Sequence, residues 1–270
     1  MGKNLSRSNN LPHRTTVFGQ ARIDNTSISR HQRALVATLA LHHRDGATIT
    51  TISDAIWGNQ IPHTATASIQ NQISRLRTTF GEDLINTERN RYYLSSDNDV
   101  GNFEATITKS LRFQPSDETA QALSAALLLW VGRPYEDIED NSRAMAEVAR
   151  LEHLRGLAVE HLAIGRMLTD QFAQAIAELS ERTADIPFHE RAWELLMIAM
   201  YMSDRRIEAL EAYARFENLV RVEFAARPSN ALKRLRRIIA AGDSVDLRAV
   251  LSIPHDDSHA VQPLRSLVSA

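Results

Sequence analysis

The fold of the front half of this chain is indicated most clearly by the stretch Thr64–Phe80, TATASIQNQISRLRTTF. Placed at 100° intervals on a helix, its large apolar side chains fall in one narrow stripe, namely Ile69, Ile73, Leu76 and Phe80. The stretch contains no aspartate or glutamate, and Gly81 follows at the position where helices commonly end. We therefore predict a helix that buries this stripe and turns polar and cationic side chains toward solvent.

The opposite side of that helix carries side chains that can read DNA. Asparagine pairs with adenine and arginine with guanine, while serine and threonine hydroxyls bond base edges or phosphates. The helical positions select five candidate DNA contacts, Ser68, Asn71, Ser74, Arg75 and Thr78. Arg77 lies on the flank, where a phosphate contact would position the protein without reading sequence.

A leading sheet and two shorter helices are predicted before this helix. Short β-branched runs between residues 15 and 29 indicate strands bent at Asp24–Asn25. Ser29 and Thr51 each stand three residues before a Gln or Asp that can complete a capping box, so each is expected to begin a helix. The first of these helices should reach about residue 43, and the second should end at Trp57–Gly58.

A β-hairpin is predicted after the helix. β-like runs at 84–87 and 92–94 flank a cationic tip. The side chains there that can reach a minor groove or flanking phosphates are Arg89 and Arg91, with Thr87 and Asn90. Strands, three helices and a hairpin follow one another in the order of a winged helix. We therefore predict a winged helix-turn-helix DNA-binding domain over residues 15–96.

The rear half has helical periodicity throughout. Six pairs of positions are related by a spacing of 34 residues, Leu162 and Leu196, Leu168 and Met202, Asp170 and Asp204, Ala175 and Ala209, Ile176 and Leu210, and Leu179 and Tyr213. That spacing is the tetratricopeptide period, in which each helix pair buries its apolar face against a neighbouring pair. The predicted fold is mainly α with small β, a winged helix-turn-helix followed by an all-α tetratricopeptide-like domain at 103–241.

The remaining segments are polar or rich in turn-forming residues. We expect a flexible N-terminus at 1–14, a linker at 97–102 and a loosely ordered C-terminal tail at 242–270. The tryptophans at 57, 130 and 193 are expected to fill cores.

The composition of the 270 residues excludes several kinds of protein. Cysteine is absent, which rules out disulfides, thiolate metal sites and cysteine nucleophiles. The net charge of −2 is unevenly distributed, because residues 1–100 hold 11 basic against 8 acidic residues and so carry +3. Neither a secretory signal nor a bilayer-length apolar run is present, so we expect a cytoplasmic protein with no membrane association.

Enzymatic and metal-binding interpretations find no support in the sequence. The histidines at 42 and 43, or at 153 and 161, lack the spacing and carboxylates of a metal site. The acidic run at 136–140 lacks the calcium-loop pattern and should be solvated or meet a basic partner. Phosphate-binding loops and nucleophile elbows are absent. We therefore expect no enzyme, and neither catalytic residues, metal nor cofactor.

Several motifs, in order, resemble a known family. The front half is similar to the response-regulator type of winged helix at Ala55–Gly58, Thr64–Ala67, Ile73–Arg77 and Tyr92–Leu94. The rear half is similar to the bacterial transcriptional activation domain at Ala126–Pro134, Ala149–Arg155, Glu190–Met197 and Arg206–Tyr213. Together they resemble the Streptomyces antibiotic regulatory protein (SARP) family, over residues 15–241.

The resemblance implies an activator that binds direct repeats at promoters and helps recruit RNA polymerase holoenzyme, commonly for secondary metabolism. It also implies self-association of two copies on the repeats. By position, the DNA contacts of the family fall on Arg75, Arg77, Thr87 and Arg89. The wing departs from the family pattern Gly-x-Gly-Tyr, since Asn90–Tyr93 stands there, although asparagine tolerates the left-handed conformation of a turn.

A second hypothesis stays open. Some winged helices bind protein, and a helical-repeat scaffold could use this one in that way. Duplex DNA affinity of the front half discriminates between the two hypotheses.

Overall fold

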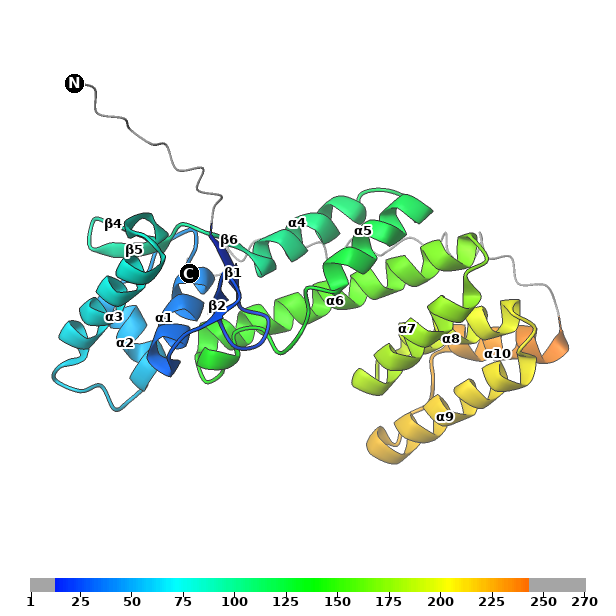
Figure 1. Cartoon of the computed structure of the whole chain (residues 1–270). Coiled ribbons are helices and arrows are strands. Elements are labelled where there is room, and N and C mark those ends of the chain that lie inside the picture. The colour runs from blue at the N-terminus through cyan, green and yellow to red at the C-terminus, as the bar shows by residue number, and fades with distance from the viewer. Residues whose placement is uncertain (1–12, 243–270) are drawn as a thin grey trace, which may run out of the picture. The chain divides into compact units, whose positions relative to one another are not determined.

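The structure is a computed structural model that describes residues 13–242, and it is mainly helical with a few short strands (Figure 1). The described residues divide after Gly165 into two compact units. The expected flexibility of residues 1–12 and the expected loose tail at 243–270 lie outside the described residues. His13 and Arg14 are described, and Arg14 begins the first strand.

The first unit contains most of the elements. They are β1 (Arg14–Thr16), β2 (Arg22–Ile23), β3 (Thr26–Ser27), α1 (Arg30–Leu41), α2 (Ile49–Trp57), α3 (Ala65–Phe80), η1 (Glu82–Leu84), β4 (Ile85–Glu88), β5 (Arg91–Leu94), β6 (Asp97–Asn98), α4 (Asp99–Ser110), α5 (Asp117–Leu127), η2 (Glu136–Ile138) and α6 (Ser142–Leu168). The second unit starts in the last turn of α6 and continues through α7 (Phe172–Asp185), α8 (Glu190–Met202), α9 (Arg206–Phe224) and α10 (Asn230–Ala241).

The leading sheet has the strand order β3-β2-β1-β6. Its strands are two or three residues long, and the chain turns between β2 and β3 at Asp24 and Asn25, whose φ angles are 50° and 61°. The predicted bend is therefore confirmed. The parallel pairing of β6 with β1, Arg14 opposite Asp97, was not predicted.

The linker predicted at 97–102 is wrong. Residues 97 and 98 form β6, and α4 begins at Asp99. Asn98 caps that helix, because its side-chain oxygen accepts a hydrogen bond from the amide of Gly101 at 2.6 Å. The turn-forming residues that suggested a linker therefore form the short strand β6, and Asn98 at its end is the N-cap of α4. The first unit runs on to Gly165, so the front half and the first helices of the rear half form one body.

Two of the three predicted helix starts are confirmed. The amide of Ser29 donates to Gln32 Oε1 at 3.0 Å, and α1 follows. α3 begins directly after Thr64 and ends at Gly81, whose φ is 120°. The prediction that Thr51 caps the second helix is wrong. The N-cap of α2 is Thr48, three residues earlier, and its hydroxyl oxygen accepts a hydrogen bond from the amide of Thr51 at 3.1 Å.

An aromatic cluster joins the leading sheet to the helices of the rear half. Phe18, which is 1% exposed, packs against Phe103 at a ring-centroid distance of 5.2 Å and against Trp130 at 4.7 Å. Beside it the backbone of Gly19 donates to Arg133 O at 2.9 Å. The backbones approach so closely that a Cβ on Gly132 would stand 2.9 Å from Gly19 Cα.

Two carboxylates strengthen this junction. Asp99 is buried and accepts the amides of Val17 at 2.9 Å and Phe18 at 3.1 Å, while burial raises the pKa of its carboxyl group. Asp137 accepts the amide of Ala21 and the Arg33 guanidinium, each at 2.7 Å. The acidic run at 136–140 therefore meets a basic partner through Asp137.

The 34-residue repeat is visible in the turns of the second unit. Asp170 and Asp204 both adopt positive φ, at 59° and 62°. The same backbone bond closes each turn, from residue 171 to Arg166 O at 2.8 Å and from residue 205 to Met200 O at 2.9 Å. Trp193 is buried in this unit, whereas the other two tryptophans are half-buried against the core of the first.

Candidate nucleic-acid interface

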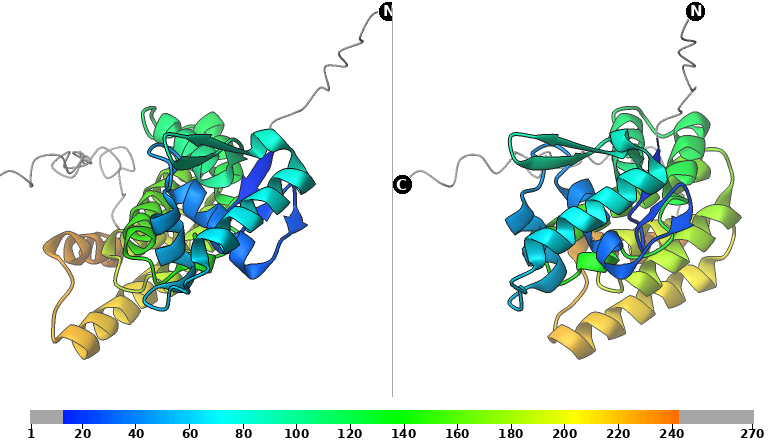
Figure 2. Two further views of the ribbon diagram at one scale, coloured as in Figure 1. Left: turned by 90° about the vertical axis from the view of Figure 1, so that its left-hand side faces the viewer. Right: turned by 60° about the vertical axis from the view of Figure 1, so that its left-hand side comes forward.

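The apolar stripe of α3 anchors the helix as the sequence predicts. Ile69, Ile73 and Leu76 are at most 2% exposed, and Phe80 is half-buried. Both views in Figure 2 show the β4–β5 hairpin lying beside this helix. α3 and the hairpin therefore frame one surface of the first unit.

The candidate base-reading side chains of α3 face solvent. Asn71, Ser74, Arg75 and Thr78 are exposed, and Ser68 is half-buried. The hydroxyl of Thr78 donates to Ser74 O at 2.9 Å, which leaves its oxygen able to accept. Within residues 13–242, the side chains of Asn71 and Arg75 make no hydrogen bond or ion pair, so their full hydrogen-bonding capacity is available to a ligand.

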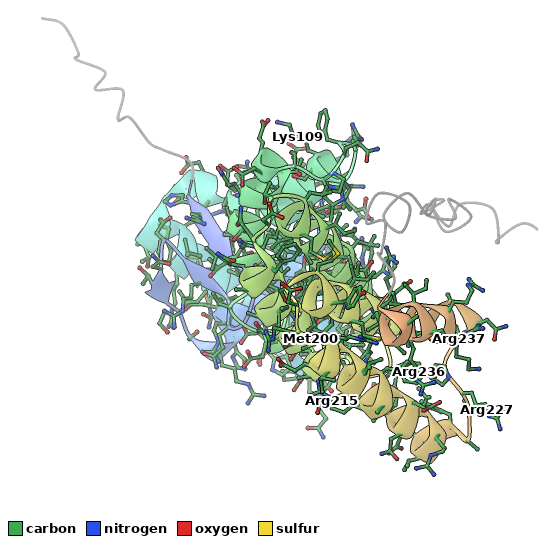
Figure 3. The ribbon with its side chains drawn as sticks, turned by 90° about the vertical axis from the view of Figure 1, so that its right-hand side faces the viewer. Lys109, Met200, Arg215, Arg227, Arg236 and Arg237 are labelled. Carbon is green, nitrogen blue, oxygen red and sulfur yellow. The ribbon has the colours of Figure 1, made fainter. Side chains whose placement is uncertain are left out.

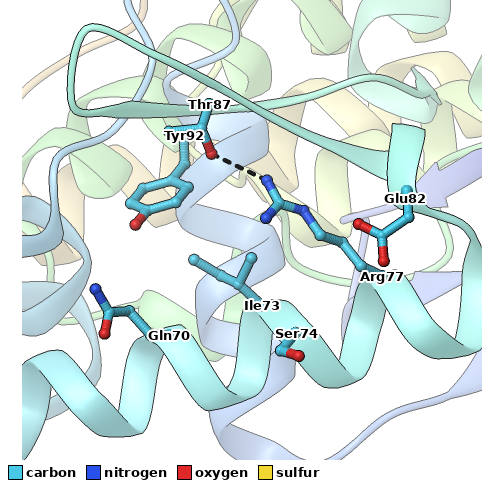
Figure 4. Close-up of a pocket in the computed structure, with 7 residues that line it drawn as sticks. All are labelled: Gln70, Ile73, Ser74, Arg77, Glu82, Thr87 and Tyr92. Atoms are coloured by element: carbon cyan, nitrogen blue, oxygen red, sulfur yellow. Dashed lines mark hydrogen bonds between the residues drawn. The ribbon is translucent and has the colours of Figure 1, made fainter.

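Arg77 has an intramolecular role that the sequence did not predict. Its Nε and Nη2 donate to Ile85 O at 3.0 and 2.6 Å, and Nη2 also donates to Thr87 Oγ1 at 2.9 Å (Figure 4). One guanidinium therefore braces the hairpin against α3. Thr87, itself a predicted contact, is exposed beside this brace.

The hairpin tip is a tight two-residue turn. Arg89 and Asn90 have φ angles of 48° and 64°, and Glu88 pairs with Arg91 across the strands. Arg89 is exposed and has no side-chain partner among the described residues. Asn90 takes the left-handed conformation expected of it, so the turn forms without the glycines of the family pattern.

Arg91 points back to the turn between α1 and α2. Its Nη1 donates to the carbonyl oxygens of Asp45 and Gly46, both at 3.1 Å. Position 46 requires glycine because its φ is 65° and a Cβ there would lie 2.6 Å from Tyr93 Cζ. In this same turn a hydrogen bond from Arg143 lowers the pKa of the Asp45 carboxyl group.

A hollow between α3 and the hairpin adds residues that sequence reasoning missed. It measures about 300 Å³, and its lining includes Gln70, Glu82 and Tyr92 (Figure 4). The sequence did not single out these three as contacts, although Tyr92 lies in a family motif, because they meet only once the hairpin folds over the helix. α3 itself contains no aspartate or glutamate, but the residues that follow it do. The acidic residues around this surface are Glu82, Asp83 and Glu88.

Two further properties of the described residues bear on the site. Among residues 13–242, His, Asp and Glu side chains form no group of three that could hold a metal ion. In the same range no helix has both the length and the apolarity to span a bilayer.

Comparison with known proteins identifies the family. Residues 98–240 match the model of the bacterial transcriptional activator domain. The regulatory protein DnrI of Streptomyces peucetius is 30% identical over 239 residues, which cover 81% of this chain and 86% of DnrI. The chain belongs to the Streptomyces antibiotic regulatory protein family. This SARP-family protein is thus a member of a family of transcriptional activators.

Other relatives extend the similarity. The regulatory protein AfsR of Streptomyces griseus is 31% identical over 230 residues, 81% of this SARP-family chain but only 23% of AfsR. A solved structure, Mycobacterium tuberculosis EmbR in complex with a low-affinity phosphopeptide, superposes with a TM-score of 0.78 at 26% identity. That match covers 89% of this chain and 68% of EmbR. The relatives carry the names of regulators rather than enzymes.

Proposed function

We propose that this SARP-family protein is a sequence-specific DNA-binding activator whose α3 enters the major groove while the β4–β5 hairpin reaches flanking DNA. The observation that carries the proposal is the free, exposed pair Asn71 and Arg75 on a helix anchored by a buried stripe. Arginine and asparagine in this setting match guanine and adenine edges. Ser74 on the same face, and Arg89 at the hairpin tip, complete the surface.

The two braced arginines contribute in a different way. Arg77 and Arg91 hold the hairpin to α3 and to the α1–α2 turn, and a guanidinium can at the same time offer a remaining N–H to a phosphate. We assign them the positioning of the hairpin together with backbone contacts. Ser68, Thr78 and Thr87 supply hydroxyls for base edges or phosphates.

Membership of the family supports a proposal for the biological role. The protein would bind direct repeats at a promoter as two copies side by side, help recruit RNA polymerase holoenzyme, and act on a pathway of secondary metabolism. Titration of duplexes with one or two repeats, followed by stoichiometry, tests the first part. Run-off transcription with purified holoenzyme tests the second.

The central test replaces Arg75 with alanine. Losing a bidentate base contact should cost ~1–3 kcal/mol on a promoter duplex and relax the preference for one base pair. Fluorescence anisotropy on the promoter and on a shuffled duplex measures both effects. Arg112→Ala, which removes an exposed arginine remote in sequence from α3, is the matched control and should bind normally.

Two results would count against the proposal. Equal affinity of wild type and Arg75→Ala on the promoter would remove α3 as the base-reading element. Absence of salt-dependent affinity for any duplex would favour the alternative, a helical-repeat scaffold whose winged helix binds protein.

A further inference from the structure

The C-terminal end of the second unit carries a dense positive charge. Five of the 17 residues from Ala225 to Ala241 are basic, Arg227, Lys233, Arg234, Arg236 and Arg237, and none is acidic. In the whole chain acidic residues outnumber basic ones, 33 to 31, so this stretch departs from the composition around it. We call this stretch the α10 basic segment.

The geometry of α10 turns this charge outward. Leu232, Leu235 and Ile239 are at most 5% exposed and form the face that packs into the unit. Arg234 and Arg237 are exposed on the other side, and Figure 3 shows Arg227 and Arg237 extending into solvent. The packed face holds the helix in place, so the backbone positions that carry the cations are fixed.

These cations are not neutralised by neighbours in the structure. Within residues 13–242 none of the five makes an ion pair. Arg236 lies 5.2 Å above the Tyr213 ring, and Arg237 Nε makes only a long contact of 3.5 Å to Lys233 O. The α10 basic segment contains no carboxylate, and Glu190 and Glu217 nearby bond the Ser229 amide and the Tyr213 hydroxyl rather than its cations. A surface of arginines without ion pairs to the described residues favours a polyanion as its ligand.

The side chains exposed on α10 distinguish between three possible anionic ligands, which are a membrane, a protein and a nucleic acid. A membrane would need the apolar face of α10, which is already buried. A protein partner would be expected to seat a large apolar anchor at the centre of the patch. Besides the cations, α10 exposes the small or polar residues Asn230, Ala231, Ala240 and Ala241. Its one large apolar side chain in the exposed class is Ile238, which is only 37% exposed. Phosphodiesters need only charge and N–H donors, and the small side chains allow their close approach.

We propose that the α10 basic segment is a second DNA contact, which binds the phosphate backbone of duplex DNA without reading its sequence. The inference rests on the proposed function, since the winged helix supplies the specific site and the segment adds non-specific affinity. Arg234 and Arg237 form its core.

The test compares two double variants of the full chain that remove the same charge. Arg234→Gln with Arg237→Gln alters the segment, and Lys109→Gln with Arg112→Gln alters exposed cations of the first unit as the control. Affinity is measured between about 50 and 200 mM salt on two duplexes. One spans only the promoter repeats, and the other carries about 30 additional base pairs on each side. Circular dichroism melting confirms that both variants fold.

Removal of two phosphate contacts should lower the salt slope of log affinity by about 1.8 on the long duplex. The advantage of wild type over the α10 variant should then shrink about twelvefold between 50 and 200 mM salt. The control should keep the wild-type slope.

Other outcomes overturn the inference. Identical slopes for wild type and the α10 variant on both duplexes would exclude a DNA contact. If the α10 variant kept the wild-type salt slopes but failed to activate run-off transcription, the segment would bind an acidic protein surface instead of DNA. Arg75→Ala reports on the proposed function separately, because it lowers promoter affinity whatever the α10 variant does.

Discussion

Arg75 and Arg77 stand two residues apart on α3 and have different surroundings. Arg75 is exposed without an intramolecular partner among the described residues, whereas Arg77 is half-buried and donates to Ile85 O and Thr87 Oγ1. A ligand can therefore take the whole guanidinium of Arg75 but only part of that of Arg77. We expect substitution of Arg75 to change specificity and substitution of Arg77 to change the position of the hairpin.

Arg77→Lys should destabilise the first unit by about 1–2 kcal/mol, because lysine keeps the charge but cannot make the forked contact to Ile85 O. It should also weaken binding to all duplexes by a similar factor, since the hairpin loses its brace. Thermal unfolding and anisotropy measure the two effects. Arg75→Lys is the control and should melt like wild type. An unchanged melting temperature for Arg77→Lys would show that the brace contributes nothing to stability.

Among the elements, the segment between α5 and η2 is the one that couples the two halves of the sequence. It contains Trp130 and Gly132, and its backbone pairs with the leading sheet, with Tyr135 donating to Val17 O at 2.8 Å. The pairing works only because two glycines meet at the crossing. A side chain on Gly132 would run into backbone, which cannot rotate away as a side-chain end can.

Gly132→Ala should therefore cost about 1–3 kcal/mol of unfolding free energy through overpacking. The amides of Gly19 and Tyr135, which pair across this crossing, should also exchange faster with solvent. Urea denaturation and hydrogen exchange provide the measurements. Val131→Ala is the neighbouring control, because Val131 is 79% exposed and its truncation should leave stability within ~0.5 kcal/mol. Normal stability of Gly132→Ala would mean that the crossing can open without cost.

In the molecule as a whole, the residues before position 97 do not form a complete hydrophobic core by themselves. The Phe18 ring packs against Phe103 and Trp130. The backbone amides of Val17 and Phe18 donate hydrogen bonds to the Asp99 carboxylate. All three partners lie beyond residue 96, where the sequence suggested that the winged helix ends. The domain boundary inferred from composition thus cuts through a packed core.

A fragment of residues 1–96 should accordingly fold poorly, whereas 1–168, which ends with α6, should unfold cooperatively and bind promoter DNA. The short fragment exposes Phe18 and leaves two buried amides without their acceptor, a loss of several kcal/mol. Circular dichroism melting and amide NMR spectra of the two fragments decide the matter. A cooperative melt of 1–96 at the midpoint of 1–168 would contradict the shared core.

Local signals predicted many features of the fold. The stripe of α3, the Ser29 capping box, the turns at Asp24–Asn25 and Arg89–Asn90, and the 34-residue period each depend on residues close together in the chain. Failures arose where local signals compete. Thr48 and Thr51 are both adequate caps, and Asp97–Gly101 has the composition of a loop but is used as strand and helix cap.

For the candidate site, the sequence alone determined which face of α3 is buried and which side chains face solvent, because helical periodicity assigns both. Only the tertiary structure decided that Arg77 and Arg91 are tied to backbone carbonyls and that Gln70 and Tyr92 share a hollow. It alone also decided that the residues before position 97 share their core with α4 and Trp130. Those facts depend on contacts between segments far apart in the chain, such as Ala21 with Asp137, which are separated by 116 residues. No local pattern encodes such contacts.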